Sequence, residues 1–300
     1  MFNKILIPLD GSELAERALE PAFTLAQQAE GGVLLLRVAA PQPLLASTRP
    51  VYGDYGITLP VQTSAEAQTE AESYLKTTRQ DKAPRGLSVW LEVQSDGVAE
   101  AIVDTAADIH CDLIVMSSHG YSGVTRWVLG SVAEKVLRKA PCPVLVIRAP
   151  RPIRRVLVPL DGSPLAEAAL QPALALAAGF GAEVTLLRVI GAPEAEVLKQ
   201  LDQIEKGLSQ RVLEDMSAAA KTYLRDLSDR RRRAGVEIKT TVVDGSAAAG
   251  ILDYAETRAM DLIAMSTHGR TGLQRWIYGS VTEKVLHGTQ QSMLVVRPSG

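Results

Sequence analysis

The chain has 300 residues, 46% of them hydrophobic, and this length suggests about two domains with cores of ordinary size. Its 32 basic and 34 acidic side chains nearly balance, which argues against the broad basic face of a nucleic-acid-binding protein. No apolar run approaches the roughly 20 residues that cross a bilayer, and the opening MFNKILIPLDGS is too short for a signal-peptide core. Composition therefore predicts a cytoplasmic protein without a membrane segment.

The first half alternates predicted strands and helices. KILIPL (4–9) is typical of a strand buried on both faces, and Ser12 stands at the N-cap of a helix expected to end near residue 29. Then follow a strand GVLLLRV (32–38), a long helical segment, a strand LSVWLEV (87–93), a helix, a strand DLIVM (112–116), a glycine loop, a helix opening at GSV, and a strand PVLVIR (143–148). Five strands alternating with helices indicate a parallel sheet with right-handed crossovers.

The second half repeats the first. ILIPLDGSELAERAL (5–19) returns as VLVPLDGSPLAEAAL (156–170), and residues 112–138 match 261–287 at seventeen of twenty-seven positions without a gap. A repeat of this length indicates two copies of one domain, not a solenoid unit. We therefore predict two domains of the same fold, residues 1–149 and 153–300. The linker at RAPRPIRR is so short that the two domains must pack side by side.

The copies differ most after their second strands. The first carries PQPLLASTRPVYGDYGITLPVQ (41–62), which is too irregular for a helix, and the second carries a charged helical stretch from about Pro193 to Arg233. Its four arginines, Arg230 to Arg233, are interpreted as a solvated helix end and not as a polyanion site.

Few residues suggest catalysis or metal binding. Cys111 and Cys142 lack the spacing of a zinc site and are expected to be buried free thiols. His119 and His268 each precede a loop glycine without a nucleophile or acid–base partner, so a structural role is favoured.

The carboxyl ends of the strands form the candidate site. Asp10 and the loop 120–131 follow strands of one parallel sheet, as do Asp161 and the loop 269–280, so each pair is expected to line one crevice. Glycines and a helix N-terminus suit a phosphate, and the aspartate suits a ribose hydroxyl or an adenine edge. The absence of GKST and GxGxxG argues against a P-loop or dinucleotide site. An alternative is structural: Ser131–Glu134 and Ser280–Glu283 fit the capping box of an ordinary helix.

IPLDGS, LLRV and MSSHGYSGVTRWVLGSVAEKVLRKAPCPVLVIR, with their second copies, resemble the universal stress protein family over essentially the whole chain. The resemblance implies two Rossmann-like α/β domains, each a five-stranded parallel sheet with helices on both faces, related by a pseudo-twofold axis. It further implies that the final strands of the two domains pair with each other, as in an intrachain dimer.

The family's nucleotide-binding members carry a loop of Gly, two residues, Gly, nine residues, Gly and Ser or Thr. Here a serine replaces the first glycine in both copies; it would be strained if that position needs a positive φ and tolerated if φ is negative. By resemblance, the residues that bind nucleotide are Asp10, Val38, Ser117, Gly120, Gly130, Ser131 and Val132 in the first copy, and Asp161, Val189, Ser266, Gly269, Gly279, Ser280 and Val281 in the second. Arg270 beside the second loop favours that site if only one is filled.

The resemblance implies a cytoplasmic stress-response protein that binds ATP, with Mg²⁺ or Mn²⁺ accompanying the phosphates. ATP would act as a regulatory switch toward protein partners with little or no turnover, and no nucleic acid or membrane partner is expected. Further homodimerisation is compatible with this plan. Two alternatives stay open: a scaffold that binds proteins and no nucleotide, and a slow ATPase.

Overall fold

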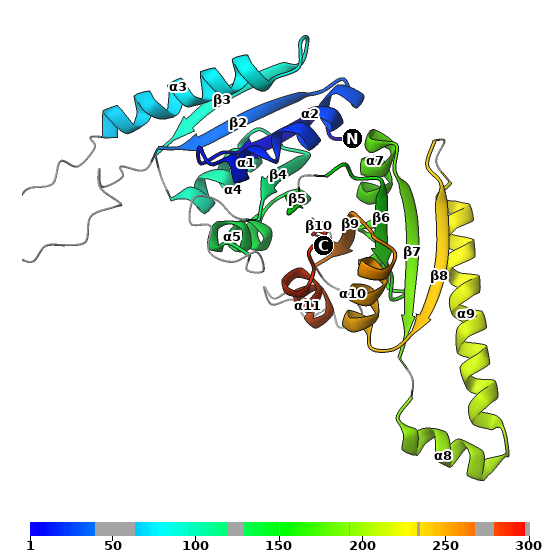
Figure 1. The fold of residues 1–300 in the computed structure, drawn as a ribbon. Coiled ribbons are helices and arrows are strands. Elements are labelled where there is room, and N and C mark those ends of the chain that lie inside the picture. Colours follow the sequence, from blue (N-terminus) through cyan, green and yellow to red (C-terminus); the bar gives the residue numbers. More distant parts are fainter. Residues whose placement is uncertain are drawn as a thin grey trace, which may run out of the picture.

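The structure is a computed structural model that describes residues 1–39, 64–95, 97–118, 129–149, 151–191, 193–232, 235–267 and 279–297. Its described strands form one mixed sheet of ten strands in the order β3-β2-β1-β4-β5-β10-β9-β6-β7-β8. In Figure 1 this sheet runs through the molecule from β3 at one end to β8 at the other. Strands β1 to β5 are parallel to one another, as are β6 to β10, which confirms the two predicted five-stranded parallel halves.

The elements follow the predicted order in each half. In the first they are β1 (Lys4–Pro8), α1 (Glu13–Glu16), α2 (Leu19–Gln28), β2 (Gly32–Val38), α3 (Ser64–Lys82), β3 (Ser88–Gln94), α4 (Val98–Asp108), β4 (Leu113–Ser117), α5 (Ser131–Lys139) and β5 (Val144–Ile147). In the second they are β6 (Arg155–Pro159), α6 (Pro164–Glu167), α7 (Leu170–Phe180), β7 (Glu183–Ile190), α8 (Ala195–Ile204), α9 (Leu208–Arg230), β8 (Ile238–Asp244), α10 (Ala247–Thr257), β9 (Leu262–Ser266), α11 (Ser280–Gly288) and β10 (Ser292–Val296).

One predicted helix in each half is in fact two. The segment from Ser12 to about residue 29 breaks between α1 and α2, and its copy breaks between α6 and α7. Pro21 and Pro172 explain the break. Each lies in the first turn of the second helix, where a missing N–H is tolerated, but proline has no N–H to donate to a carbonyl of the preceding helix.

The two halves join through their last strands. β5 and β10 pair antiparallel, with Leu145 opposite Leu294 and Val146 opposite Met293. The strand order reads the same from either end, as a pseudo-twofold axis between β5 and β10 requires. The expected pairing of the final strands is therefore confirmed, and two apolar edges are removed from solvent.

Helices cover both faces of the sheet (Figure 1). One core, which includes Leu145 and Leu294, lies against α1, α2, α6, α7 and the sheet-packed part of α9. The other, which includes Val146 and Met293, lies against α4, α5, α10 and α11. Both cores contain residues from the two halves, so burial is continuous across the seam.

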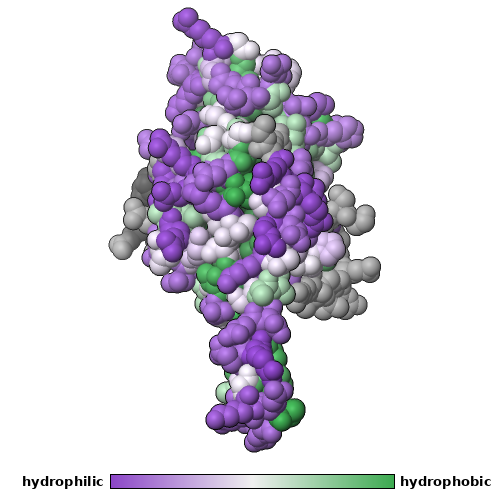
Figure 2. Space-filling model, turned by 90° about the vertical axis from the view of Figure 1, so that its right-hand side faces the viewer, coloured by the Kyte–Doolittle hydropathy of each residue, from purple (hydrophilic) through white to green (hydrophobic). Residues whose placement is uncertain are grey.

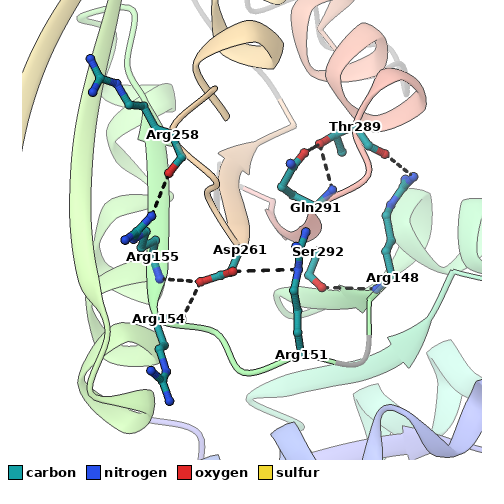
Figure 3. A network of polar contacts seen from close by, with 9 residues as sticks. All are labelled: Arg148, Arg151, Arg154, Arg155, Arg258, Asp261, Thr289, Gln291 and Ser292. Atoms are coloured by element: carbon teal, nitrogen blue, oxygen red, sulfur yellow. Dashed lines mark hydrogen bonds and ion pairs between the residues drawn. The ribbon is translucent and has the colours of Figure 1, made fainter. Parts of the chain in front are cut away.

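A polar network also crosses the seam (Figure 3). The Arg148 guanidinium donates to the carbonyl oxygens of Leu286 at 2.6 Å and Thr289 at 2.9 Å, at the end of α11. The Asp261 carboxylate accepts from the backbone amides of Arg154 at 2.9 Å and Arg155 at 3.0 Å, which fixes the end of the linker against β9. The short connection between the copies is thus held on both sides.

The charged stretch after β7 forms a projecting hairpin of α8 and α9, not one long helix. The chain reverses at Gly207, whose φ is +83°, and the Asp202 carboxylate accepts from the Ser209 amide at 3.0 Å and hydroxyl at 2.7 Å. No residue of α8 is buried, and Ile204 is 77% exposed. Figure 2 shows this hairpin as a narrow projection with apolar atoms along one side.

Other expectations concern single residues. Cys111 and Cys142 are buried and free, as predicted. Arg230 to Arg232 are exposed at the end of α9, and Arg233 lies outside the described residues. No helix in the described part of the chain is long and apolar enough to span a membrane.

Candidate functional site: two strand-end crevices

Each half carries the same turn after its first strand. Asp10 Oδ1 accepts from the Ser12 amide at 3.0 Å and hydroxyl at 2.6 Å, and Ser12 Oγ in turn caps the Ala15 amide at 3.1 Å. The second copy reproduces this arrangement from Asp161 to Ala166 with distances of 2.9, 2.6 and 3.1 Å. The glycine between aspartate and serine has φ of +86° in the first copy and +81° in the second, which only glycine adopts readily.

This turn lies where the strand order reverses. β1 has β2 on one side and β4 on the other, and β6 likewise lies between β7 and β9. Parallel pairing brings the carboxyl ends of β1 and β4 to the same edge, so Asp10 and Ser117 follow neighbouring strands there. Asp161 and Ser266 occupy the same positions in the second half. The strand ends that carry these residues therefore lie at the topological switch point of each half, where a parallel sheet is expected to bind ligands.

The helix after the loop begins at a glycine N-cap, which has no side chain to cap the first turn. Gly130 is the N-cap of α5 and Gly279 is the N-cap of α11, and neither has a side-chain cap. The capping-box interpretation of Ser131 and Ser280 is thus wrong in its placement, because each serine is already the first helical residue. The amides of Ser131, Val132, Ser280 and Val281 lie in the first helical turn, where N–H groups have no partner within the helix and the helix dipole is positive.

A hydrogen bond closes the base of each loop. The Gly130 amide donates to the Ser118 carbonyl at 2.9 Å, and the Gly279 amide donates to the Thr267 carbonyl at 2.7 Å. The start of the helix is thereby tied to the end of the strand. Several predicted residues fall inside the loops 119–128 and 268–278 and lie outside the described residues, namely Gly120, Gly269, His119, His268 and Arg270.

The two serines that replace the first loop glycine are accommodated. Ser117 and Ser266 end β4 and β9, and neither is among the described non-glycine residues with positive φ, which are Phe2, Glu30, His110 and Ala259. The replacement therefore costs no backbone strain. In the second half, Thr282 Oγ1 also donates to the Ser266 carbonyl at 2.9 Å and joins α11 to β9.

Val38 and Val189 end or nearly end the second strand of each half, beside the Asp turn. Both side chains are half-buried. A Cβ on Gly250 of α10 would lie 3.0 Å from Val189 Cγ1, so α10 packs closely against this valine. The valines therefore lie at the carboxyl ends of β2 and β7, and their contact with adenine stays a prediction.

A tyrosine–glutamate pair beside the Asp turn of each half was not predicted from the sequence. The Tyr74 hydroxyl donates to Glu16 Oε1 at 2.9 Å, and the Tyr223 hydroxyl donates to Glu167 Oε1 at 3.0 Å. Burial, with a smaller contribution from the glutamate, raises the pKa of both tyrosines above the usual range. The sequence signal that could have revealed these pairs is the arginine of LLRV, Arg37 in β2 and Arg188 in β7, because it is a charged residue in an apolar strand of both copies and acts on the tyrosine of its half.

A cavity that the described residues form is lined by a different set of residues. A groove of about 720 Å³ runs between α1, α2 and the linker, and includes Glu20, Phe23, Lys82, Arg151 and Ile153. None of the predicted nucleotide residues lines it. Within the described residues, no group of three or more His, Cys, Asp or Glu side chains could hold a metal ion.

Comparison with known proteins gives one consistent family. A family model described as the universal stress protein family matches residues 1–148 and 152–297. The universal stress protein Rv2005c of Mycobacterium tuberculosis is 31% identical over 222 residues, which cover 70% of this chain and 70% of the relative.

Solved structures agree on the fold. The crystal structure of a universal stress protein from Archaeoglobus fulgidus is 21% identical, covers 100% of both chains and has a TM-score of 0.70, which shows a common fold over the whole length. A crystal structure described as a universal stress protein in complex with cAMP is 22% identical, covers 50% of this chain and 100% of its own, and has a TM-score of 0.37.

Proposed function

The chain belongs to the universal stress protein family, and on that premise we propose that it binds an adenine nucleotide, ATP, at one or both strand-end crevices. Occupancy acts as a regulatory switch with little or no turnover. The domains that carry the two sites are residues 1–149 and 153–300, in a reducing, cytoplasmic compartment that suits free thiols.

One observation carries this proposal. In both halves, a helix N-terminus whose N-cap is a glycine is tied by a backbone hydrogen bond to the end of the strand that neighbours the Asp turn. Anionic phosphates complement free N–H groups and the positive end of a helix dipole, whereas a carboxylate repels phosphate and accepts from a hydroxyl. The crevice therefore offers opposite chemistry at its two ends, as a nucleotide requires.

The proposed contacts follow from this polarity. Phosphates bind the amides at the start of α5 or α11, and a ribose hydroxyl donates to the Asp carboxylate. Adenine lies against the strand end that Val38 or Val189 marks. The glycines of the loops, Gly120 and Gly269, allow the backbone to approach the phosphates. Any Mg²⁺ or Mn²⁺ that accompanies the nucleotide is held largely by its phosphates.

A second candidate function is that of a scaffold that binds proteins without nucleotide. The α8–α9 hairpin favours it, because α8 carries the apolar residues Val197, Leu198, Leu201 and Ile204 at helical spacing and buries none of them. The two functions are compatible if nucleotide controls partner binding.

The test begins with the intact protein. It is denatured, and the supernatant is examined by chromatography for released nucleotide; stripped protein is then titrated by calorimetry with ATP, ADP and cAMP, with and without Mg²⁺. Asp161→Asn preserves an acceptor oxygen for Ser163 but removes the charge, and is expected to weaken the second site by at least about tenfold. Gly279→Ala should do the same by crowding the phosphates.

Asp10→Asn and Gly130→Ala are the matched variants of the first site. Loss of a distinct binding phase in each pair would assign that phase to its domain. A protein that releases no nucleotide and stays silent up to millimolar ATP would overturn the proposal and leave the scaffold function. Steady ATP hydrolysis that Asp161→Ala abolishes would instead reveal an ATPase.

A further inference from the structure

A half-buried arginine lies beside the Asp turn in each half. Arg37 is in β2 and Arg188 is in β7, strands that are otherwise almost wholly apolar. The Arg37 side chain is only 17% exposed. Placing a guanidinium among buried strand residues costs free energy unless partners satisfy it, so the neighbours of these arginines are informative.

Both arginines belong to a repeated trio with a glutamate and a tyrosine. The tyrosine donates to the glutamate in each half, and the two pairs are separated by 58 residues (Tyr74 and Glu16) and by 56 residues (Tyr223 and Glu167). The contact persists although the intervening sequences differ in length and composition. Because the two copies have otherwise diverged in this region, we interpret this contact as a structural requirement and not only as an inheritance from a common ancestor.

In the first half the guanidinium lies between the tyrosine ring and the turn. Arg37 Cζ is 4.6 Å from the centroid of the Tyr74 ring, a cation–π contact. A Cβ on Gly11 would lie 2.5 Å from Arg37 Nη1, so the guanidinium touches the backbone directly after Asp10. Arg37 also forms an ion pair with Glu70 on α3 at 3.9 Å.

In the second half the guanidinium bonds the turn itself. Arg188 Nη1 donates to the carbonyl oxygen of Leu160 at 3.2 Å, the residue directly before Asp161. Asp161 and Arg188 act in opposite directions on the pKa of Tyr223, the aspartate raising it and the arginine lowering it, so both charges lie near that hydroxyl. Burial keeps the phenol protonated, so it remains a donor to Glu167.

We propose that Arg188, held by this trio, is a positioning residue that fixes the Asp161 turn for a ribose hydroxyl and makes the second crevice the tighter nucleotide site. The inference rests on the proposed function. Among the described residues, Arg37 divides its contacts between Tyr74, Glu70 and Gly11, whereas Arg188 donates a hydrogen bond to the carbonyl oxygen that leads into its aspartate. A carboxylate whose backbone is fixed in advance loses less entropy when it binds.

The experiment uses the full chain with Arg188→Gln and its matched variant Arg37→Gln, and Arg225→Gln as an exposed control on α9. Two quantities are measured: amide hydrogen exchange of residues 161–166 without ligand, and ATP binding by calorimetry. We expect Arg188→Gln to accelerate exchange in that turn, where Asp161 holds the Ser163 amide, and to weaken the tighter binding phase roughly tenfold. Arg37→Gln and Arg225→Gln should leave that phase unchanged.

Two further variants separate positioning from general stability. Tyr223→Phe removes only the hydroxyl and should change both readouts in the same direction by less. Arg188→Lys restores the charge without the planar fork and should recover part of the affinity. Acceleration of exchange throughout the second half, or unchanged exchange at 161–166, would overturn the positioning role.

The nucleotide proposal fails separately from this one. If the wild-type chain binds no nucleotide, the exchange measurement on the ligand-free protein still decides whether Arg188 fixes the turn. If the wild type binds and Arg188→Gln binds equally tightly, the positioning role is wrong although the nucleotide site is real.

Discussion

Ser163 serves two neighbours at once. Its hydroxyl donates to Asp161 and accepts from the Ala166 amide, so it both holds the aspartate and caps α6. Ser12 does the same for Asp10 and α1. One serine in each half thus stabilises the start of a helix and also positions the aspartate that is proposed to bind ribose. Removing the serine affects helix stability and nucleotide binding, and each effect can be measured separately.

Ser163→Ala is expected to lower the free energy of unfolding by about 1 kcal/mol, the usual effect of losing an N-cap hydroxyl. Urea denaturation checks the value, and Ser12→Ala is the matched variant, expected to behave alike because its distances are nearly identical. Replacement by threonine, which retains the hydroxyl, should cost less. Equal losses for alanine and threonine would mean that the hydroxyl does not cap the helix.

Helix α11 has unlike surroundings at its two ends. Its N-terminus has a glycine N-cap at the proposed phosphate site, whereas its last carbonyls accept from Arg148, which comes from the first half of the chain. Burial lowers the pKa of Arg148 to about 10, so the guanidinium stays charged at neutral pH and complements the negative end of the helix dipole. The cation that stabilises this helix is therefore supplied across the domain seam.

Arg148→Met should destabilise the protein by about 1–3 kcal/mol, because two carbonyl groups lose a charged donor in a partly buried place. Arg151→Met is the control, since Arg151 makes a half-exposed ion pair with Asp261 at 3.9 Å that should be worth no more than about 1 kcal/mol. Thermal or denaturant unfolding gives both values. Similar losses for the two variants would contradict the role of Arg148 as a helix cap.

At the level of the whole molecule, β5 and β10 turn two domains into one sheet. Leu145 and Leu294 face each other in this pair, and both are 0% exposed. A separated half would expose its last strand as an unpaired apolar edge. The covalent linker raises the effective concentration of the two edges, and the antiparallel pairing of β5 and β10 joins them.

Residues 1–149 and 153–300, produced as separate chains, are therefore expected to associate one to one. Light scattering coupled to size exclusion measures the complex and at the same time tests the predicted domain boundaries. Leu294→Lys should abolish association by placing a charge in the seam. Thr240→Lys on the exposed edge strand β8 should leave it intact. Halves that stay monomeric and folded would contradict this expectation, because the apolar edges of β5 and β10 would then be stable in contact with solvent.

Much of the fold was accessible from the pattern of residues because its determinants are local or repeated. Continuous apolar runs such as KILIPL mark strands buried on both faces, and their alternation with helices requires a parallel sheet. The duplicated sequence implies two copies of this plan. The Asp turns and the helices that open at GSV could also be placed at the carboxyl ends of strands, since parallel pairing gathers these ends at one edge.

The remaining features depend on contacts between residues far apart in the chain. The arginine of LLRV is visible in the sequence as a charge in an apolar strand, but its partner is not. Only the fold shows that Arg188 reaches the backbone before Asp161 and that Arg148 caps a helix of the other half. The break between α8 and α9 depends on Gly207 and Asp202, because Gly207 adopts a positive φ and Asp202 accepts from Ser209. These two roles are visible only in the folded structure. Sequence periodicity reports which face of an element is buried, whereas the partner on that face is chosen by the packing of the whole sheet.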